Sequence, residues 1–396
     1  MPRKSAAGSG TIRKKTVTRQ GKEYTYWEAR YTEGFDPGTG KQIQRSITGK
    51  TQKEVAKKLK EATASIDAGT YTAPSKMTVG QWLDIWTAEY LGGVKPLTVS
   101  SYKSTIKTHL KPGLGSIRLD SLATHTIQSF LNGLDKPGKD RPVGLSAKTV
   151  KNVHGVLHRA LQQAVSNGYI RFNPADACVL PRREKKDIQP LDESMISQFL
   201  KSIKGHRFEH LFTFTLFTGL REGEALGLLW DCVDFDKNTI LVNKQLQVVK
   251  GEKGKYTLTP TKNSKGRTIS VAPSVMQVLR RVKVQQLENK LRYGECWADT
   301  GFVFTDDLGL HLKHITVYKN FKKLVTDMGS PNTRFHDLRH SYAVASIRSG
   351  DDIKTVQENL GHATASFTLD VYGHVTEQMK KDSAARMEAF IKTVSQ

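Results

Sequence analysis

Several polar residues in the second half of the sequence have the chemical types that bind a phosphate. Arg221 follows the turn sequence Thr-Gly-Leu, and Glu224 lies three residues further on, where its carboxylate could hold the guanidinium. His336 and Arg339 are also three residues apart, so an imidazole and a guanidinium would share one face of a helix. An Arg followed by a Glu at this spacing is usually a surface ion pair, and the spacing of His336 and Arg339 is common as well.

Two further residues complete this set. His362 follows a Leu-Gly turn, and Tyr372 comes ten residues later within the word Val-Tyr-Gly-His-Val. Alone, such a tyrosine would be interpreted as a half-buried aromatic side chain. Among several cations it has a second interpretation, because a phenol with a pKa of about 10 becomes a nucleophile where its neighbours favour the phenolate.

The order and spacing of these residues resemble the tyrosine recombinases, which form the phage integrase family. The two arginines are 118 residues apart, 23 residues separate Arg339 from His362, and 10 separate His362 from Tyr372. The flanking words TGLREGEALGL, HDLRHSYA, LGH and VYGHV fit the family as well. The resemblance covers the whole chain. It implies a catalytic set of Arg221, His336, Arg339, His362 and Tyr372, with Glu224 supporting Arg221.

The resemblance also implies the reaction. Tyr372 would attack a DNA phosphate and form a covalent 3′-phosphotyrosyl intermediate, while the two arginines stabilise the negative charge of the transition state. The family uses a lysine on a β-hairpin to protonate the leaving 5′-oxygen, and Lys262 fits best when Arg267 is taken as the anchor. Lys265 is the alternative, because the hairpin length varies. No metal ion or cofactor is expected, and the sequence contains neither a P-loop nor an acidic cluster suited to two metal ions.

The N-terminal 70 residues are predicted to form a three-stranded sheet with one helix. The patterns of Thr11–Thr18, Tyr24–Tyr31 and Gln42–Ile47 indicate strands, and a helical pattern begins at Thr51. Basic and aromatic side chains on the exposed face suit contact with phosphates and bases, although a solvated basic face is the alternative. The resemblance identifies residues 1–70 as an arm-type DNA-binding domain. The residues expected to contact DNA are Arg13, Lys14, Lys15, Tyr26 and Arg30.

Residues 79–180 are predicted to form a basic, all-helical domain that resembles the core-binding domain of the family. One helix is expected to begin near Thr98, and another to run from Ser146 to Gly168. Along the helix that begins near Thr98, lysines repeat every four residues and form a lysine ridge. Because like charges at that spacing repel, this ridge indicates an anionic partner. The residues expected to contact DNA are Lys103, Lys107, Lys111, Lys148 and Lys151.

The charged segment Pro181–Pro190 marks a boundary before the catalytic domain, residues 191–396. This domain is expected to be mainly helical, with strands within residues 239–271 and an apolar helical stripe in the tail. In the related integrases such a tail packs on a neighbouring subunit, and packing on its own domain is the alternative. The fold class expected is multidomain α+β: a small sheet with one helix, an all-helical domain, and a mainly helical catalytic domain with a small antiparallel sheet.

The composition supports a partner of opposite charge. A net charge of +23, from 61 Lys and Arg against 38 Asp and Glu, indicates a polyanion. No apolar run approaches the roughly 18 residues of a membrane-spanning helix, and no apolar segment follows the basic N-terminus. Cys178, Cys232 and Cys296 form neither a disulfide framework nor a zinc site. We therefore expect a cytoplasmic protein, associated with the bacterial nucleoid when it acts, that binds DNA and no membrane.

The expected function is integration and excision of a mobile genetic element. The expected partners are double-stranded DNA at core and arm sites, further copies of the chain in a tetramer, an excisionase and a host DNA-bending protein. Two other functions remain open. A type IB topoisomerase-like strand transferase shares the chemistry, but the N-terminal sheet and the apolar tail argue against it. A non-catalytic DNA-binding regulator is disfavoured because every expected site position is filled. The arm domain favours a conjugative transposon over a temperate phage as the source.

Overall fold

A computed structural model defines the fold, and it describes residues 10–35, 38–68, 76–137, 143–182, 190–249, 252, 254–261, 266–362, 364 and 376–395. The contacts between residues divide the chain into two compact units, Met1–Glu184 and Lys185–Gln396. Within the described ranges, no helix is both long and apolar enough to cross a membrane.

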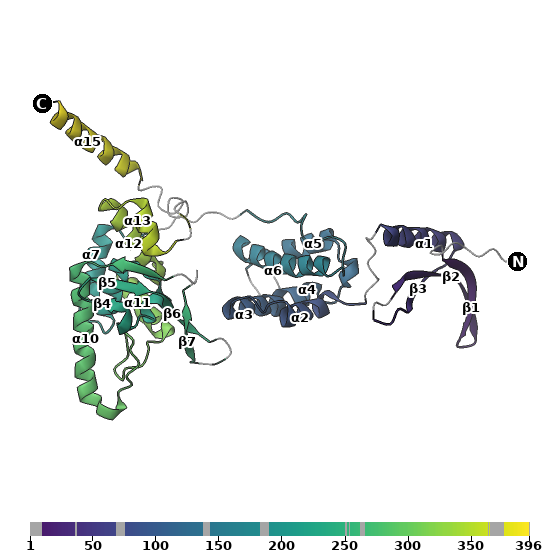
Figure 1. Ribbon diagram of the computed structural model, residues 1–396, viewed down its shortest axis with the longest axis horizontal. Coiled ribbons are helices and arrows are strands. Elements are labelled where there is room, and N and C mark those ends of the chain that lie inside the picture. Colours follow the sequence, from purple (N-terminus) through teal and green to yellow (C-terminus); the bar gives the residue numbers. More distant parts are fainter. Residues whose placement is uncertain are drawn as a thin grey trace. The chain divides into compact units, whose positions relative to one another are not determined.

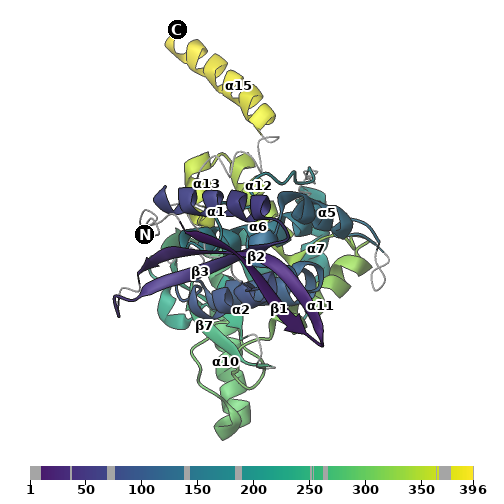
Figure 2. The same cartoon turned by 90° about the vertical axis from the view of Figure 1, so that its right-hand side faces the viewer.

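The first unit begins with a three-stranded antiparallel sheet that packs against one helix (Figures 1 and 2). Ala29 and Tyr31 of the central strand form a small core with Val55 and Leu59 of the helix. Thr51 begins the helix, because its side chain accepts a hydrogen bond from the backbone N–H of Glu54. The predicted sheet with one helix is therefore confirmed. Its elements are β1 (Thr11–Arg19), β2 (Lys22–Phe35), β3 (Gln42–Gly49) and α1 (Gln52–Asp67).

Helices form the rest of the described part of the first unit, as predicted. Trp82 is fully buried at their centre, and its indole N–H donates to the carbonyl of Ala160 at 2.8 Å. Ser146 caps the last helix, and Gly168 beyond its end has a φ of 72°. The elements are α2 (Val79–Glu89), α3 (Pro96–Thr105), η1 (Ile106–Leu110), α4 (Lys111–Leu114), η2 (Leu119–Ser121), α5 (Thr124–Leu134) and α6 (Ala147–Ser166).

The helix expected from Thr98 is interrupted by a π turn, η1, which the periodicity did not predict. The N–H of Lys111 bonds to the carbonyl of Ile106, five residues earlier. Pro112 gives the physical reason, because a proline inside a helix lacks an N–H and its ring clashes with the carbonyl four residues before it. The wider π turn leaves room for that ring. The residues after it are rotated relative to a regular helix.

The second unit combines two small antiparallel sheets with helices (Figure 1). One sheet has the strand order β4-β5-β8, and β6 pairs with β7 in a separate hairpin, so the predicted strand block is confirmed. A cluster of phenylalanine rings that includes Phe199, Phe212 and Phe321 forms the centre of the core. The elements are α7 (Glu193–Ser202), α8 (Glu209–Thr218), α9 (Glu222–Leu226), η3 (Trp230–Cys232), β4 (Val233–Asp234), β5 (Thr239–Val242), β6 (Lys244–Val248), β7 (Tyr256–Pro260), β8 (Arg267–Ser270), α10 (Pro273–Tyr293), η4 (Gly294–Cys296), α11 (His314–Asp327), α12 (Phe335–Arg348), α13 (Ile353–Leu360) and α15 (Thr376–Val394).

Candidate active site

Arg221 is placed by the tight connection between α8 and α9. Gly219 ends α8 with a φ of 64°, and a Cβ there would lie 2.4 Å from the ring of Tyr342 on α12. Only glycine permits both this backbone conformation and this close approach. Arg221 then precedes α9, and its Nη1 donates to Oε1 of Glu224 at 2.7 Å. The expected Arg221–Glu224 pair is therefore present in the structure.

Glu224 is buried with only 1% of its side chain exposed, and it binds two arginines. Its second partner is Arg267 at the start of β8, whose Nη2 donates to Oε2 at 2.7 Å and whose Nη1 donates to Oε1 at 3.1 Å. Burial alone would raise the pKa of the Glu224 carboxyl, but the hydrogen bond from Arg267 and the charges of both arginines lower that pKa to about 2. Glu224 is therefore ionised at neutral pH.

Arg339 is a buried guanidinium that ties the ends of two other helices together. Its residue is 2% exposed, and it projects from α12. Nη1 donates to the carbonyl of Gly219 at 2.8 Å, and Nη2 donates to the carbonyl of Leu360 at 2.5 Å. These two carbonyls lie at the ends of α8 and α13, next to Arg221 and His362 in the sequence. Arg339 therefore brings three of the predicted site residues into one place.

His362 follows the left-handed turn at Gly361, where φ is 63°. The carbonyl of Gly361 accepts a hydrogen bond from Nη2 of Arg221 at 3.4 Å. This bond holds the turn next to the residue that precedes α9. Burial, followed by the charges of Arg339 and Arg221, lowers the pKa of His362 from 6.5 to about 3. Its imidazole is therefore neutral at pH 7.

His336 lies one turn before Arg339 on α12. Its ring packs edge-on against His340, with the ring centroids 4.9 Å apart. Although the residue is exposed on one side, partial burial and then the charges of Arg339 and Arg221 lower its pKa to about 4. His336 is therefore a neutral imidazole that can accept or donate a hydrogen bond at the edge of the site.

The structure thus brings together Arg221, Glu224, His336, Arg339 and His362. Tyr372, Lys262 and Lys265 lie outside the described residues, so their assignments stay predictions. Within the parts of the chain that the structure describes, no His, Cys, Asp and Glu side chains gather into a group that could hold a metal ion.

Sequence reasoning missed the role of Arg267, which it used only as a landmark for the hairpin lysine. A buried carboxylate needs more hydrogen-bond partners than one arginine supplies. That rule indicates a second partner for Glu224 once its burial is known, but it does not identify Arg267. His340 was likewise overlooked, and burial lowers its pKa to about 4.

The exposed face of the N-terminal sheet gathers three predicted DNA contacts around one carboxylate. Glu28 is 6% exposed and accepts hydrogen bonds from Arg13 at 2.7 and 3.0 Å. Lys15 and Arg30 approach the same carboxylate at 3.6 and 3.7 Å. The register pairs Tyr26 with Lys15, so the phenol shares this face. These side chains form a mixed basic and aromatic surface with a net charge of +2, from three cations and one anion.

Lys14 does not belong to this surface. The register pairs it with Trp27, which packs in the core under α1, so Lys14 points to the opposite side of the sheet from Arg13 and Lys15. Successive residues of a strand alternate between faces, and three consecutive residues cannot line one face. Arg13 and Lys15 therefore share one face of the sheet, and Lys14 lies on the other.

The three lysines of the ridge predicted in the helical part differ in their contacts. Lys103 and Lys107 are exposed, but Lys111, which follows the π turn, pairs with both carboxylate oxygens of Asp84 at 2.7 Å. Lys111 therefore differs from Lys103 and Lys107, because an ion pair with Asp84 engages its charge.

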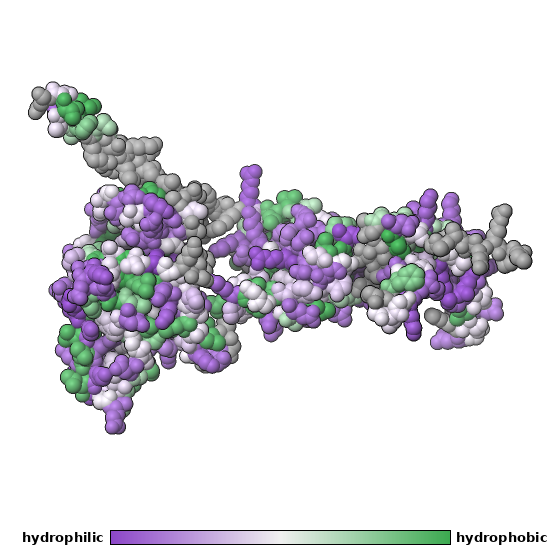
Figure 3. All heavy atoms as spheres, in the orientation of Figure 1, coloured by the Kyte–Doolittle hydropathy of each residue, from purple (hydrophilic) through white to green (hydrophobic). Residues whose placement is uncertain are grey.

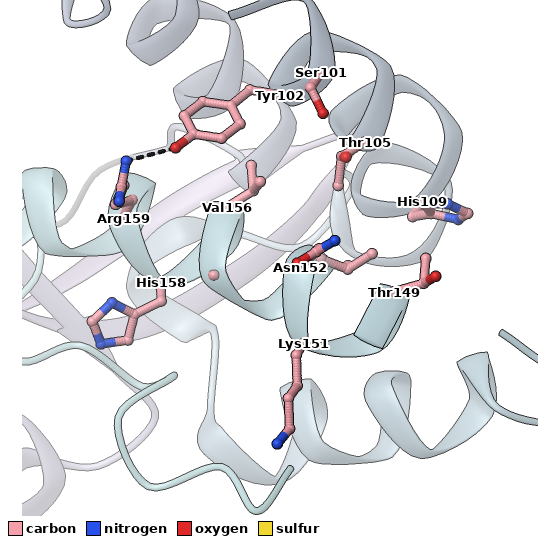
Figure 4. Close-up of a pocket in the computed structure, with 12 residues that line it drawn as sticks. Ser101, Tyr102, Thr105, His109, Thr149, Lys151, Asn152, Val156, His158 and Arg159 are labelled. Atoms are coloured by element: carbon pink, nitrogen blue, oxygen red, sulfur yellow. Dashed lines mark hydrogen bonds between the residues drawn. The ribbon is translucent and has the colours of Figure 1, made fainter. Parts of the chain in front are cut away.

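A groove of about 570 Å³ lies between α3, η1 and α6 (Figure 4). Hydroxyl, amide and imidazole side chains line it, and Arg159 donates to the phenol oxygen of Tyr102 at 2.6 Å on one wall. Lys151 contributes to the lining, and its side chain extends away from the other labelled residues. Lys148, in the first turn of α6, is exposed. The polar lining includes Ser101, Thr105, His109, Thr149 and Asn152.

Comparison with known proteins places this geometry in a family. The phage integrase family model matches residues 186–379, and the model of the N-terminal SAM-like domain of phage integrases matches residues 78–134. A XerC-like tyrosine recombinase of Caldanaerobacter subterraneus subsp. tengcongensis is 31% identical over 390 residues, covering 94% of this chain and 97% of that protein. The chain belongs to the phage integrase family. It is an enzyme of the tyrosine site-specific recombinase class.

Solved structures agree with this fold. A Tn1549 transposon integrase in complex with transposon right end DNA has a TM-score of 0.66 at 25% identity, covering 79% of this chain and 100% of that one. A lambda integrase tetramer bound to a Holliday junction has a TM-score of 0.54 at 19% identity, covering 88% of this chain and 96% of that one. The expected multidomain α+β fold is therefore confirmed.

Proposed function

We propose that this recombinase cuts and rejoins DNA strands through a covalent 3′-phosphotyrosyl intermediate, and that it integrates and excises a mobile genetic element. The observation that carries the proposal is the convergence of Arg221, Arg339 and His362 at the ends of α8 and α13. Two guanidiniums and a neutral imidazole at one point suit a phosphodiester, whose transition state gains negative charge. The transposon source of the Tn1549 relative supports the mobile element.

The proposed reaction starts when the Tyr372 oxygen attacks the phosphorus atom of the scissile phosphate. The phenol proton passes to His336, a neutral imidazole with capacity to accept it. A tyrosyl–phosphorus bond forms, the bond from phosphorus to the 5′-oxygen breaks, and that oxygen takes a proton from the Lys262 ammonium and leaves as a hydroxyl. Religation reverses these steps with the 5′-hydroxyl of another strand. The phosphodiester bond energy is kept in the tyrosyl ester, so no further reactant is needed.

DNA is proposed to bind both parts of the first unit. The sheet face around Glu28 supplies cations and a phenol, and the groove between α3 and α6 supplies hydroxyl and amide groups suited to phosphates and base edges. Long hydrophilic side chains project from the face of this unit shown in Figure 3. The Tn1549 relative, which was solved as a fragment with DNA, supports DNA binding as such, and we assign arm sites to the sheet and core sites to the helices.

Assembly is proposed to involve α15. Met387, Phe390, Ile391 and Val394 form an exposed apolar stripe at helical spacing, which a neighbouring copy of the chain would cover in a tetramer. The lambda integrase that shares the fold was solved as a tetramer on a Holliday junction. An excisionase and a host DNA-bending protein complete the proposed partners, and we place the reaction on the bacterial nucleoid in the cytoplasm.

The central test replaces the nucleophile. Tyr372→Phe should abolish the covalent protein–DNA adduct on a nicked suicide duplex taken from the candidate ends of the element, because the phenol oxygen is lost. DNA affinity, measured by gel shift, should stay unchanged. An adduct in the Tyr372→Phe variant would refute the assignment of the nucleophile. Absence of any adduct in the wild-type protein would favour the non-catalytic regulator, and relaxation of supercoils without joining of two duplexes would favour the topoisomerase.

The general acid is tested by changing the leaving group. Lys262→Ala should slow cleavage strongly, and a duplex with a 5′-bridging sulfur at the scissile phosphate should restore the rate, because a thiolate leaves without a proton. Lys265→Ala is the matched control and should cleave both duplexes at rates near the wild type. A reversed pattern would transfer the role to Lys265. Equal small effects for both variants would remove the lysine from the mechanism.

A further inference from the structure

Arg267 uses its guanidinium to join three segments of the active site. Its Nη1 and Nη2 donate to the two oxygens of Glu224, and its Nε donates to the carbonyl of Asn359 at 2.7 Å. Only 12% of the side chain is exposed. The residue starts β8, which pairs with β5 and follows β7 of the other sheet in the sequence. The Arg267 side chain therefore contacts α9 near Arg221 and α13 near His362. Its own strand, β8, follows the predicted general acid Lys262 in the sequence.

The contact with the turn before His362 is close. A Cβ added at Gly361 would lie 3.1 to 3.3 Å from the guanidinium and Cδ of Arg267. The left-handed turn at Gly361 therefore packs directly on the Arg267 side chain, and the hydrogen bond to the carbonyl of Asn359 holds the last turn of α13.

The charges around Glu224 give Arg267 a second effect. Arg221 donates to both carboxylate oxygens, through Nη1 at 2.7 Å and its backbone N–H at 3.1 Å. With Arg221 alone, the buried carboxylate would cancel the charge of the arginine that must bind the phosphate. With Arg267 as a bidentate partner, two cations share one anion and a net charge of +1 remains. Of the two arginines, Arg221 is the more exposed, at 26% of its side chain.

We infer that Arg267 is a positioning residue for strand cleavage: it balances the charge of Glu224 so that Arg221 presents a net positive charge to the phosphate, and it holds the turn that carries His362. This inference rests on the proposed function. Arg267 itself is engaged by Glu224 and Asn359 and acts through them. Its loss is expected to affect the chemical step more than the binding of DNA.

The experiment compares Arg267→Gln with the double variant Glu224→Gln/Arg267→Gln in the full chain. On nicked duplexes from the candidate element ends, Arg267→Gln should slow single-turnover cleavage by about 30-fold or more, the scale of losing a preorganised charge in a transition state. The dissociation constant for DNA should change by less than about threefold, since many other contacts bind the backbone. The double variant removes the unbalanced carboxylate and should recover about tenfold of the lost rate.

Gln286→Ala is the control for a structural effect. Gln286 also joins separate segments by hydrogen bonds, to Trp230, Phe302 and Val303, and none of these partners is a site residue. This variant should lower the melting temperature without slowing cleavage below that temperature. The inference is overturned if Arg267→Gln cleaves at the wild-type rate, or if the folded double variant is no faster than the single one. Wild-type protein that forms no adduct would instead refute the proposed function.

Discussion

At the scale of single residues, the site keeps its histidines neutral while its arginines stay charged. His336 and His362 have pKa values of about 4 and about 3, because burial and the two arginines disfavour the imidazolium. A protonated histidine there would add charge to a cluster that already carries several cations. A neutral one can still accept the proton of a phenol or donate a hydrogen bond to a phosphate oxygen.

These pKa values predict that acid weakens the second unit. An unfolded histidine binds a proton near pH 6.5, whereas His336 and His362 in the folded chain stay neutral down to about pH 4 and 3. The unfolded state therefore binds more protons in this window, and stability falls as the pH drops from about 6.5 towards 4. Melting temperatures at pH 7 and pH 5 measure the loss, and the double variant His336→Gln/His362→Gln should show a smaller one. An equal loss in wild type and variant would contradict the prediction.

At the scale of elements, the glycine that ends α8 fixes how closely α12 and α13 approach Arg221. A Cβ at Gly219 would lie 2.4 Å from Tyr342 and 2.8 Å from Leu360, in a backbone conformation with a φ of 64°. The carbonyl of the same residue accepts the hydrogen bond from Arg339. One residue therefore sets both the chain direction and the contact between the two arginine-bearing elements.

Gly219→Ala is expected to cost about 1–2 kcal/mol for the left-handed backbone and about 1–3 kcal/mol for overpacking. The displacement of Tyr342 should also slow DNA cleavage, because α12 carries His336 and Arg339. Gly205→Ala is a matched control, since Gly205 has a φ of 73° but nothing within 4 Å of an added Cβ. Urea unfolding and single-turnover cleavage compare the two. If both variants lose equal stability and keep the wild-type rate, close packing at Gly219 has no role in the site.

For the whole molecule, apolar periodicity was sufficient to predict the sheet with its helix, the helical part and the strand block. The site residues followed from their order along the chain, because the resemblance supplied their grouping. The π turn at η1 was not predictable from periodicity. The extra residue of a π turn shifts the apolar side chains around the helix, but the apolar pattern remains. The pairing of Lys111 with Asp84, at the residue that follows this turn, was likewise not predicted. The role of Arg267 was hidden because it is 43 residues from Glu224 in the sequence and meets it only through the fold.

The charge of the whole molecule predicts strongly salt-dependent DNA binding, and the sheet face around Glu28 should contribute a measurable part of it. Each phosphate contact adds about 0.9 to the slope of log affinity against log salt. Glu28 neutralises one of the three cations Arg13, Lys15 and Arg30, so we expect this face to make two phosphate contacts. Replacing all three cations by Gln should therefore reduce the magnitude of the slope by about 2. Fluorescence anisotropy on a labelled duplex, over a series of salt concentrations, measures it. Lys14→Gln is the control on the opposite face of the sheet and should leave the slope unchanged. A slope lowered as much by Lys14→Gln as by the triple variant would show that the sheet binds DNA by bulk charge and not through this face.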